Sequence, residues 1–217
     1  MMDNIKFILA SASPRRHELL CSVGIPHEIL VTDADENPVG DAAAGESYAE
    51  FFAREASRLK CEAAVSTVKG RTDGITVIIA ADTVVSPDGN VIFGKPKSAD
   101  DAKAMLTTLS GREHAVVGGI TVALIDGESI KTVSRSVSTA VTFKNLTERE
   151  ISAYVASDEP DGKAGAYAIQ GLGAVFVKEI RGDYPNVVGL SVYELCRILS
   201  DEFGIKVTEQ SRYMLPL

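Results

Sequence analysis

Cysteine is scarce in this chain of 217 residues, and its three copies lie far apart, at Cys21, Cys61 and Cys196. Their number is odd and no CxxC spacing occurs. This pattern favours cysteines packed in helices within a reducing compartment over a disulfide framework or zinc ligands. The three histidines contain no two-histidine helical metal motif either. We therefore expect a cytoplasmic protein.

Long apolar runs and excess positive charge are also missing. No stretch of 18 or more apolar residues occurs, so we expect no membrane span. The N-terminus has only a short apolar run and no basic segment, so no signal peptide is expected. The net charge of −8 argues against a surface that binds nucleic acid through its phosphates. Any anionic substrate must then be held by a local cluster of cations.

Hydrophobic residues make up 45% of the chain and charged residues 24%, as in ordinary globular proteins. We treat residues 1–217 as a single domain, large enough for one core or for two lobes. Residue patterning predicts strands over 5–9, 27–31, 75–85, 91–93, 114–125, 130–143 and 174–180. Helices are expected after residue 13, over 47–68, after 98, after 147 and over 192–203. This order predicts an α/β fold with a mixed, twisted sheet and flanking helices.

Two arginines occupy an unusual position at the start of the first expected helix. Ser13 and Pro14 have the pattern of an N-cap and a first-turn proline, and Arg15 and Arg16 follow directly. Each cation there should cost about 0.3–1 kcal/mol, because the helix dipole is positive at that end. A bound anion, most plausibly a phosphate, would reverse this cost. Alternatively, both arginines are solvated or pair with nearby carboxylates.

Asp82 interrupts the uncharged strand expected over 75–85. An unpartnered carboxylate in an apolar strand is very costly, so Asp82 should face a cleft, a metal or a cation. The alternative is an aspartate that begins the turn near Ser86 early and accepts backbone N–H groups. Glu36 and Lys95 could also be ordinary solvated surface residues. Lys60, beside the apolar stripe of its helix, could simply extend its ammonium into solvent.

Considered together, these residues indicate phosphate chemistry. Arginines and lysines can hold anionic oxygens, and a carboxylate-bound Mg²⁺ can offset charge while a carboxylate activates water. A free aspartate has a pKa near 3.9 and is a poor base for water, so metal coordination or burial of Asp82 would have to narrow the gap. The chain has no GxxxxGK[ST] motif, which excludes a P-loop nucleotide hydrolase.

At these residues the sequence resembles the Maf family of nucleotide pyrophosphatases, which is related in fold to the inosine triphosphatase family. The match spans nearly the whole chain. Its motifs include Ser11-x-Ser13-Pro14-Arg15-Arg16, Asp35-Glu36, Ala81-Asp82-Thr83-Val84-Val85, Gly94-Lys95-Pro96, Lys163-Ala164-Gly165-Ala166-Tyr167 and Ile169-Gln170-Gly171. The resemblance implies two lobes around a central cleft and metal-assisted hydrolysis of a nucleoside triphosphate to the monophosphate and pyrophosphate.

The resemblance also implies roles for individual residues. It makes Asp82 the proton acceptor and gives Glu36 and Asp82 a divalent cation, Mg²⁺ or Mn²⁺. The residues that it implies for substrate binding are Ser11, Ser13, Arg15, Arg16, Lys60, Thr83, Lys95 and Gln170. Arg15, Thr83 and Gln170 occupy the three specificity positions and match the subgroup acting on dTTP and UTP. The subgroup acting on 7-methyl-GTP has Trp, Gln and Glu there.

Three positions depart from the family pattern. The family places a helix lysine three residues after an alanine, whereas here Ala56 is followed at that spacing by Leu59. Lys60 is therefore about 100° further round the helix, which puts its role in question. Gly118 and Ser191 stand where the family often has threonine and proline.

Two functions from different classes remain open at this point. One is the pyrimidine-type triphosphate pyrophosphatase. The other is a nucleotide-sensing regulatory protein, of the septum-inhibition type, without significant turnover. Neither requires a membrane or direct nucleic-acid binding, and a homodimer is common among relatives.

Overall fold

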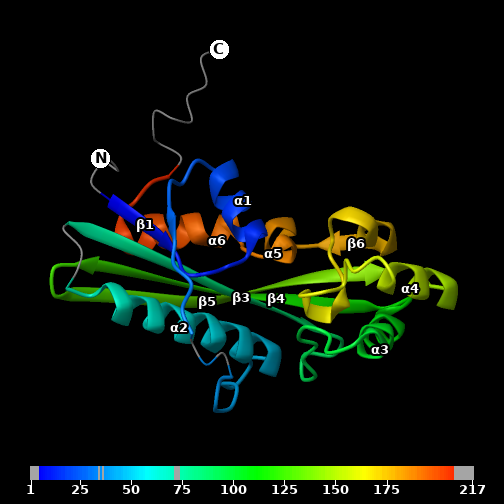
Figure 1. Cartoon of the computed structure of the whole chain (residues 1–217). Coiled ribbons are helices and arrows are strands. Elements are labelled where there is room, and N and C mark those ends of the chain that lie inside the picture. Colours follow the sequence, from blue (N-terminus) through cyan, green and yellow to red (C-terminus); the bar gives the residue numbers. More distant parts are fainter. Residues whose placement is uncertain (1–4, 34, 36, 71–73, 208–217) are drawn as a thin grey trace.

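The computed structural model describes residues 5–33, 35, 37–70 and 74–207. These residues form a six-stranded mixed sheet in the order β2-β1-β3-β4-β5-β6 (Figure 1). The strands are β1 (Ile5–Leu9), β2 (Glu28–Ile29), β3 (Ile75–Ser86), β4 (Glu113–Asp126), β5 (Ser129–Phe143) and β6 (Val177–Arg181). β1 is parallel to β2 and β3, whereas every pair from β3 to β6 is antiparallel. The predicted mixed α/β fold is confirmed.

Helices cover both faces of this sheet. The helices α1 (Pro14–Ser22), α5 (Tyr184–Val188) and α6 (Val192–Arg197) lie on one face, and α2 (Tyr48–Val68) lies on the other (Figure 1). The remaining two, α3 (Ala99–Leu109) and α4 (Glu148–Val155), lie at the far end of the long strands. None of the helices in the described ranges is long and apolar enough to cross a membrane.

The hydrophobic core is divided along the long strands. Leu9, Ile79 and Ile120 pack with Leu20 of α1 and Leu195 of α6 at one end of the sheet. A second cluster at the other end joins strand residues to α3, α4 and the segment around residue 167; it includes Val85, Leu106, Phe143, Tyr154 and Tyr167. β3, β4 and β5 run through both regions, so a residue in the middle of β3 lies between them.

Sequence patterning placed several element ends wrongly. The strand expected over 27–31 is reduced to Glu28–Ile29, and the strand expected over 91–93 is only an isolated bridge between Phe93 and Val85. The strand expected over 174–180 begins at Val177, because 3₁₀ turns fill Gly171–Phe176. Helix α5 was not predicted; it is short and starts with Asp183 as its N-cap. The closing helix is confirmed, with a π-turn over Ile198–Glu202.

Candidate active site

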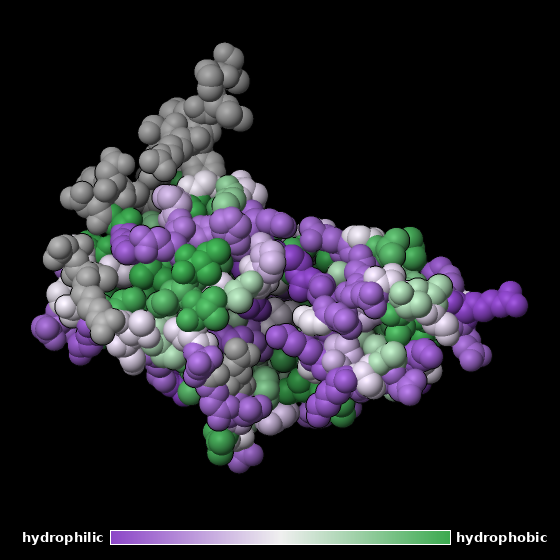
Figure 2. Space-filling model, viewed as in Figure 1, coloured by the Kyte–Doolittle hydropathy of each residue, from purple (hydrophilic) through white to green (hydrophobic). Residues whose placement is uncertain are grey.

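A cleft of about 900 Å³ lies where the two core regions meet. Every candidate substrate-binding residue lines it, together with Asp82: Ser11, Ser13, Arg15, Arg16, Lys60, Thr83, Lys95 and Gln170. The remaining candidate, Glu36, lies outside the described residues. Figure 2 shows hydrophilic side chains over the middle of the molecule, beside a hydrophobic patch. The structure therefore brings together residues that are up to 159 positions apart, as Ser11 and Gln170 are.

The topology of the sheet explains why Asp82 faces a cleft. β1 pairs with β3 only as far as Leu9 opposite Ile79, and the Ala10 N–H then donates to the Ile79 carbonyl at 2.8 Å. Beyond that point β3 continues to Ser86, and among the described residues no strand pairs with Asp82–Val84 on that side. The alternative reading of Asp82 as an early turn residue is wrong, since Asp82 lies within the strand opposite Gly119.

Lys60 of α2 binds the Asp82 carboxylate. The lysine Nζ donates to Asp82 Oδ1 at 2.6 Å, and the two side chains are only 11% and 15% exposed. The solvent-directed reading of Lys60 is therefore wrong. Its shift relative to the family spacing does not carry the side chain away from the site, because the long lysine side chain reaches inward to β3.

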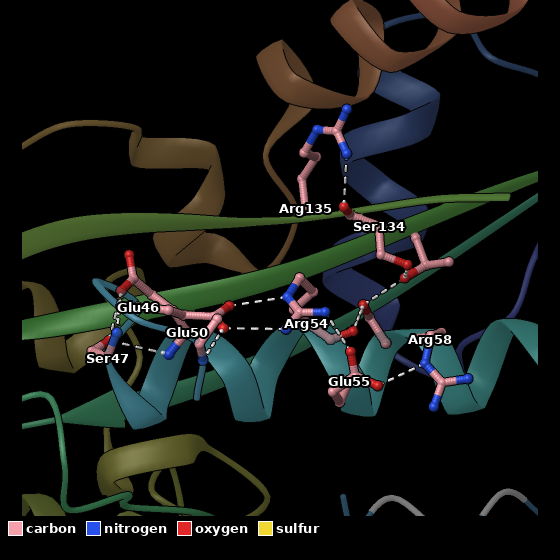
Figure 3. Close-up of polar contacts among 11 residues, drawn as sticks. Glu46, Ser47, Glu50, Arg54, Glu55, Arg58, Ser134 and Arg135 are labelled. Atoms are coloured by element: carbon pink, nitrogen blue, oxygen red, sulfur yellow. Dashed lines mark hydrogen bonds and ion pairs between the residues drawn. The ribbon is translucent and has the colours of Figure 1, made fainter. Parts of the chain in front are cut away.

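Helix α2 is fixed to the sheet one turn before Lys60. The buried Ser57 hydroxyl lies 2.8 Å from Thr121 Oγ1 on β4, and Thr121 donates to Ser134 Oγ on β5 at 2.9 Å. Figure 3 shows Ser134, where this chain of hydroxyls ends, on the strands above the helix. Gly119 lets the helix come this close, because a Cβ at that position would overlap the Ala53 carbonyl.

The outer surface of α2 carries an ion-pair chain that keeps its cations away from the cleft. Arg54 pairs with Glu46 and Glu55, and Arg58 pairs with Glu55 (Figure 3). The hydrogen bond that Arg54 donates to Glu46 raises the pKa of Arg54, and the one that Arg58 donates to Glu55 raises the pKa of Arg58. Of the cations on this helix, Lys60 lines the cleft.

Arg16 is buried and is held by groups from three parts of the chain. Its guanidinium donates to the Gly189 carbonyl at 2.8 Å, to Ser11 Oγ at 2.9 Å and to Thr83 Oγ1 at 3.2 Å. It is only 9% exposed. These contacts join α1 to β3 and to the end of α5, so the solvated reading of Arg16 is wrong. Thr83 lies opposite Gly118, where a Cβ would overlap the Asn186 side chain.

Arg15 differs from its neighbour because its guanidinium is not fully satisfied. Within the described part of the chain, its buried Nε has no hydrogen-bond partner. Burial lowers the pKa of Arg15, partly opposed by Glu18 and Tyr154. Because an arginine stays charged near pH 7, a half-buried cation with an open donor favours an anion in the cleft.

Two further lysines add positive charge to the cleft wall. Lys95 is exposed on a loop that is tied down where the Gly165 N–H donates to the Gly94 carbonyl at 3.0 Å. Lys163 lines the cleft as well, and burial together with the charge of Arg15 lowers its pKa. Sequence reasoning gave Lys163 no role, although it lies within a quoted family motif that could have identified it.

The segment that carries Gln170 is fixed on both sides. The Ala168 N–H donates to the Tyr154 hydroxyl at 3.1 Å. The N–H groups of Leu172 and Gly173 donate to the Glu159 carboxylate at 3.0 and 2.9 Å. Gln170 itself is exposed and lines the cleft. Sequence reasoning missed the positioning contacts of Tyr154 and Glu159, because they depend on side chains more than ten residues away.

The chain is similar to known proteins over most of its length. The model of the Maf family, described as Maf-like protein, matches residues 6–202. A dTTP/UTP pyrophosphatase of Alkaliphilus oremlandii is 41% identical over 93% of this chain and 98% of its own length. One of Chromobacterium violaceum is 44% identical over 94% and 98%. A solved structure, the Ham1 protein of Staphylococcus aureus, aligns over 77% of each chain at 14% identity, with a TM-score of 0.35. The family model and the near full-length relatives establish that this chain belongs to the Maf family.

Proposed function

We propose that this protein is a nucleoside triphosphate pyrophosphatase acting on dTTP and UTP. The observation that carries the proposal is the conjunction, in one cleft, of a carboxylate on an open strand edge with several cations. Asp82 is that carboxylate, and Arg15, Lys60, Lys95 and Lys163 line the same cleft. The relatives named dTTP/UTP pyrophosphatase, which match over nearly their whole length, support the same activity.

The charge balance of the cleft suits a triphosphate. Five cationic side chains line the cleft together with three anionic ones, those of Asp82, Glu159 and Asp161. The protein as a whole carries a net charge of −8, so this concentration of cations is local. Cations fixed by protein contacts stabilise negative charge without reorganising during the reaction. The volume of about 900 Å³ lies at the upper end of the usual range for small-molecule sites.

The reaction is a hydrolysis in which water attacks the α-phosphorus. The new P–O bond forms as the bond to the α,β-bridging oxygen breaks, which gives the nucleoside monophosphate and pyrophosphate. Asp82 accepts the proton that the water loses, while Lys60 holds the carboxylate at 2.6 Å. The arginines and lysines stabilise the charge that develops on the leaving pyrophosphate.

A divalent cation fits the oxygen donors of this cleft. Mg²⁺ is commonly bound through one or two carboxylates and the phosphates of a substrate. Asp82 is the described carboxylate at the open strand edge, and we assign the second position to Glu36. When bound, the ion would offset phosphate charge and lower the pKa of a coordinated water. The supporting residues are oxygen ligands, which suit Mg²⁺ or Mn²⁺.

We assign recognition of the nucleobase to Gln170. A carboxamide can donate and accept hydrogen bonds at the same time, as the edge of a uracil or thymine ring requires. Glu159 and Tyr154 fix the backbone on either side of Gln170, so the amide is presented from a rigid segment. We assign binding of the substrate phosphates to Ser11 and Ser13, which lie just before α1.

The test is a panel of canonical and modified triphosphates assayed for pyrophosphate release with Mg²⁺ and with Mn²⁺. The proposal expects the highest kcat/KM with dTTP and UTP, and equal amounts of monophosphate and pyrophosphate. Release of inorganic phosphate instead would contradict the site of attack. Tight nucleotide binding without any metal-dependent product would favour the regulatory binding protein.

A further inference from the structure

We propose that His17, Cys21 and His27 form a zinc site that is separate from the active-site cleft. Each residue offers one ligand atom, and these atoms all lie within 4.8 Å of one another. None of the three is among the described residues that line the cleft. The sequence conceals the site, because the two histidines are ten positions apart and match no metal motif.

The fold creates the cluster from a helix and the chain that follows it. His17 and Cys21 are four residues apart on α1, a spacing that puts both side chains on the same face of the helix. A turn after α1 then brings His27 back to this face, just before β2. Cys21 is exposed, so the expectation that all three cysteines pack in the interior is wrong for this residue and holds for Cys61.

The distances between the ligand atoms suit a tetrahedral ion. His17 Nδ1 lies 2.9 Å from His27 Nε2, and Cys21 Sγ lies 3.6 Å from His17 Nε2 and 3.9 Å from His17 Nδ1. Zn²⁺ bonds of about 2.0 Å to nitrogen and 2.3 Å to sulfur would separate neighbouring ligands by about 3.3–3.6 Å. Small rotations of the rings therefore complete the geometry, and water supplies the fourth ligand.

The hydrogen bond of His27 prepares its other nitrogen for a metal. His27 Nδ1 lies 2.8 Å from the Ile25 carbonyl oxygen, which can only accept, so Nδ1 carries the proton. In the neutral ring, Nε2 then presents its lone pair toward His17. A backbone carbonyl that fixes the tautomer of a histidine in this way is a usual second contact of metal-binding histidines.

The chemistry of the ligands selects the ion. Two imidazoles and a thiolate suit Zn²⁺, whereas the oxygen ligands proposed for the cleft suit Mg²⁺ or Mn²⁺. Binding converts the Cys21 thiol to a thiolate and releases one proton. The ion would join the helix that carries Arg15 and Arg16 to the start of β2, so we expect it to stabilise this region and to take no part in hydrolysis.

Cobalt substitution tests the site directly. The metal-free full-length protein is titrated with Co²⁺ in excess Mg²⁺, which occupies the cleft and gives no visible absorption. We expect one Co²⁺ per chain, a thiolate-to-cobalt charge-transfer band and the strong visible bands of a tetrahedral ion, all displaced by one equivalent of Zn²⁺. Zn²⁺ should also raise Tm.

The variants separate this site from other thiols. Cys21→Ser, at an exposed position, should abolish the charge-transfer band, and His27→Gln should weaken Zn²⁺ binding at least tenfold in a chelator competition. Cys196→Ser is the matched control and should retain both signals. Absence of the band in the unmodified protein, or its persistence in Cys21→Ser, would overturn the proposal. Pyrophosphate release by Cys21→Ser should be unchanged, so this test can fail without affecting the proposed function.

Discussion

Lys60 of α2 and Asp82 of β3 form an ion pair in the cleft, with Nζ 2.6 Å from Oδ1. The pair joins the helix on one face of the sheet to the strand whose edge β1 leaves open. Thr83, the next residue of the strand, contacts Arg16 of α1 instead. Successive side chains of a strand point to opposite faces, so at this point β3 contacts the helix layer on each face of the sheet. Asp82 contacts Lys60 of α2, and Thr83 contacts Arg16 of α1.

Asp82→Asn should reduce kcat by a factor of about 10²–10⁴, because the amide cannot accept the proton of the attacking water. The substitution keeps the shape of the side chain but leaves the ammonium of Lys60 without its carboxylate, so Tm should fall as well. Steady-state pyrophosphate release and a thermal scan measure these quantities. Asp126→Asn, at the exposed end of β4, is the control. Retention of wild-type kcat in Asp82→Asn would exclude Asp82 as the proton acceptor.

Lys60→Met should lower the free energy of unfolding by about 2 kcal/mol, because it leaves a largely buried carboxylate without its cation. The double variant Lys60→Met/Asp82→Asn should recover part of this loss, since neither charge then remains. Urea denaturation of the two single variants and the double variant measures the coupling. Additive losses would show that the ion pair contributes nothing specific to stability.

Arg15→Ala and Arg16→Ala should separate substrate binding from structure. Removing Arg15, whose Nε has no partner within the described chain, should raise KM by roughly 10–100-fold, the value of a charge-assisted hydrogen bond, and leave Tm nearly unchanged. Removing Arg16 should lower the free energy of unfolding by about 2–4 kcal/mol, because the Gly189 carbonyl and two hydroxyls lose their donor. Equal effects of the two substitutions on KM and Tm would contradict this division of roles.

Gly118 and Gly119 form a natural matched pair, because each faces a different helix behind the site. Gly119→Ala should destabilise by about 1–3 kcal/mol and reduce kcat, since the new methyl group meets the backbone of α2 at Ala53 and must displace the helix that carries Lys60. The atoms nearest to a new methyl group at Gly118 belong to the Asn186 side chain, which can shift more easily than the backbone of α2, so Gly118→Ala should cost less. Urea denaturation and kcat of both variants measure the difference. The reverse order would mean that the contact of α2 does not set the geometry.

The fold was largely predictable from the sequence, whereas the contacts that position the site were not. The apolar run over β3 and the helix start after Thr147 are local signals in the sequence, and both are confirmed. The contact of Lys60 with Asp82 depends on how closely α2 approaches the sheet, which Gly119 determines from β4. The contact between the Gln170 segment and Glu159 depends on tertiary packing in the same way. Such distances are set by tertiary packing, and no residue pattern in the sequence predicts them.

Gln170→Glu should lower kcat/KM for dTTP and UTP by at least tenfold, because a carboxylate cannot donate a hydrogen bond to the base. The comparison with Glu159→Gln separates specificity from positioning. That second variant weakens the hold on Leu172 and Gly173 and should lower kcat/KM for all triphosphates together. The triphosphate panel measures both variants. An unchanged preference in Gln170→Glu would remove Gln170 from base recognition.

His114 should make the protein sensitive to mild acid. It is buried beside Phe143 and Tyr167, its Nε2 lies 2.9 Å from the Tyr167 hydroxyl, and burial lowers its pKa to about 4. An unfolded histidine has a pKa near 6.5, so between about pH 4 and 6.5 the unfolded chain binds more protons than the folded one. The stabilisation is therefore complete above about pH 6.5 and is lost as the pH falls toward 4, by about 3 kcal/mol at most.

Urea denaturation across pH 4–7.5 measures this slope. The double variant His114→Phe/Tyr167→Phe removes both hydrogen-bonding partners and keeps the aromatic packing, so its free energy of unfolding should depend less on pH in this interval. Acidic groups such as Glu150, whose pKa the hydrogen bond from Lys144 lowers to about 2, contribute to both proteins and cancel in the difference. Identical slopes for the two proteins would show that folding does not shift the pKa of His114, and would contradict the expected sensitivity to acid.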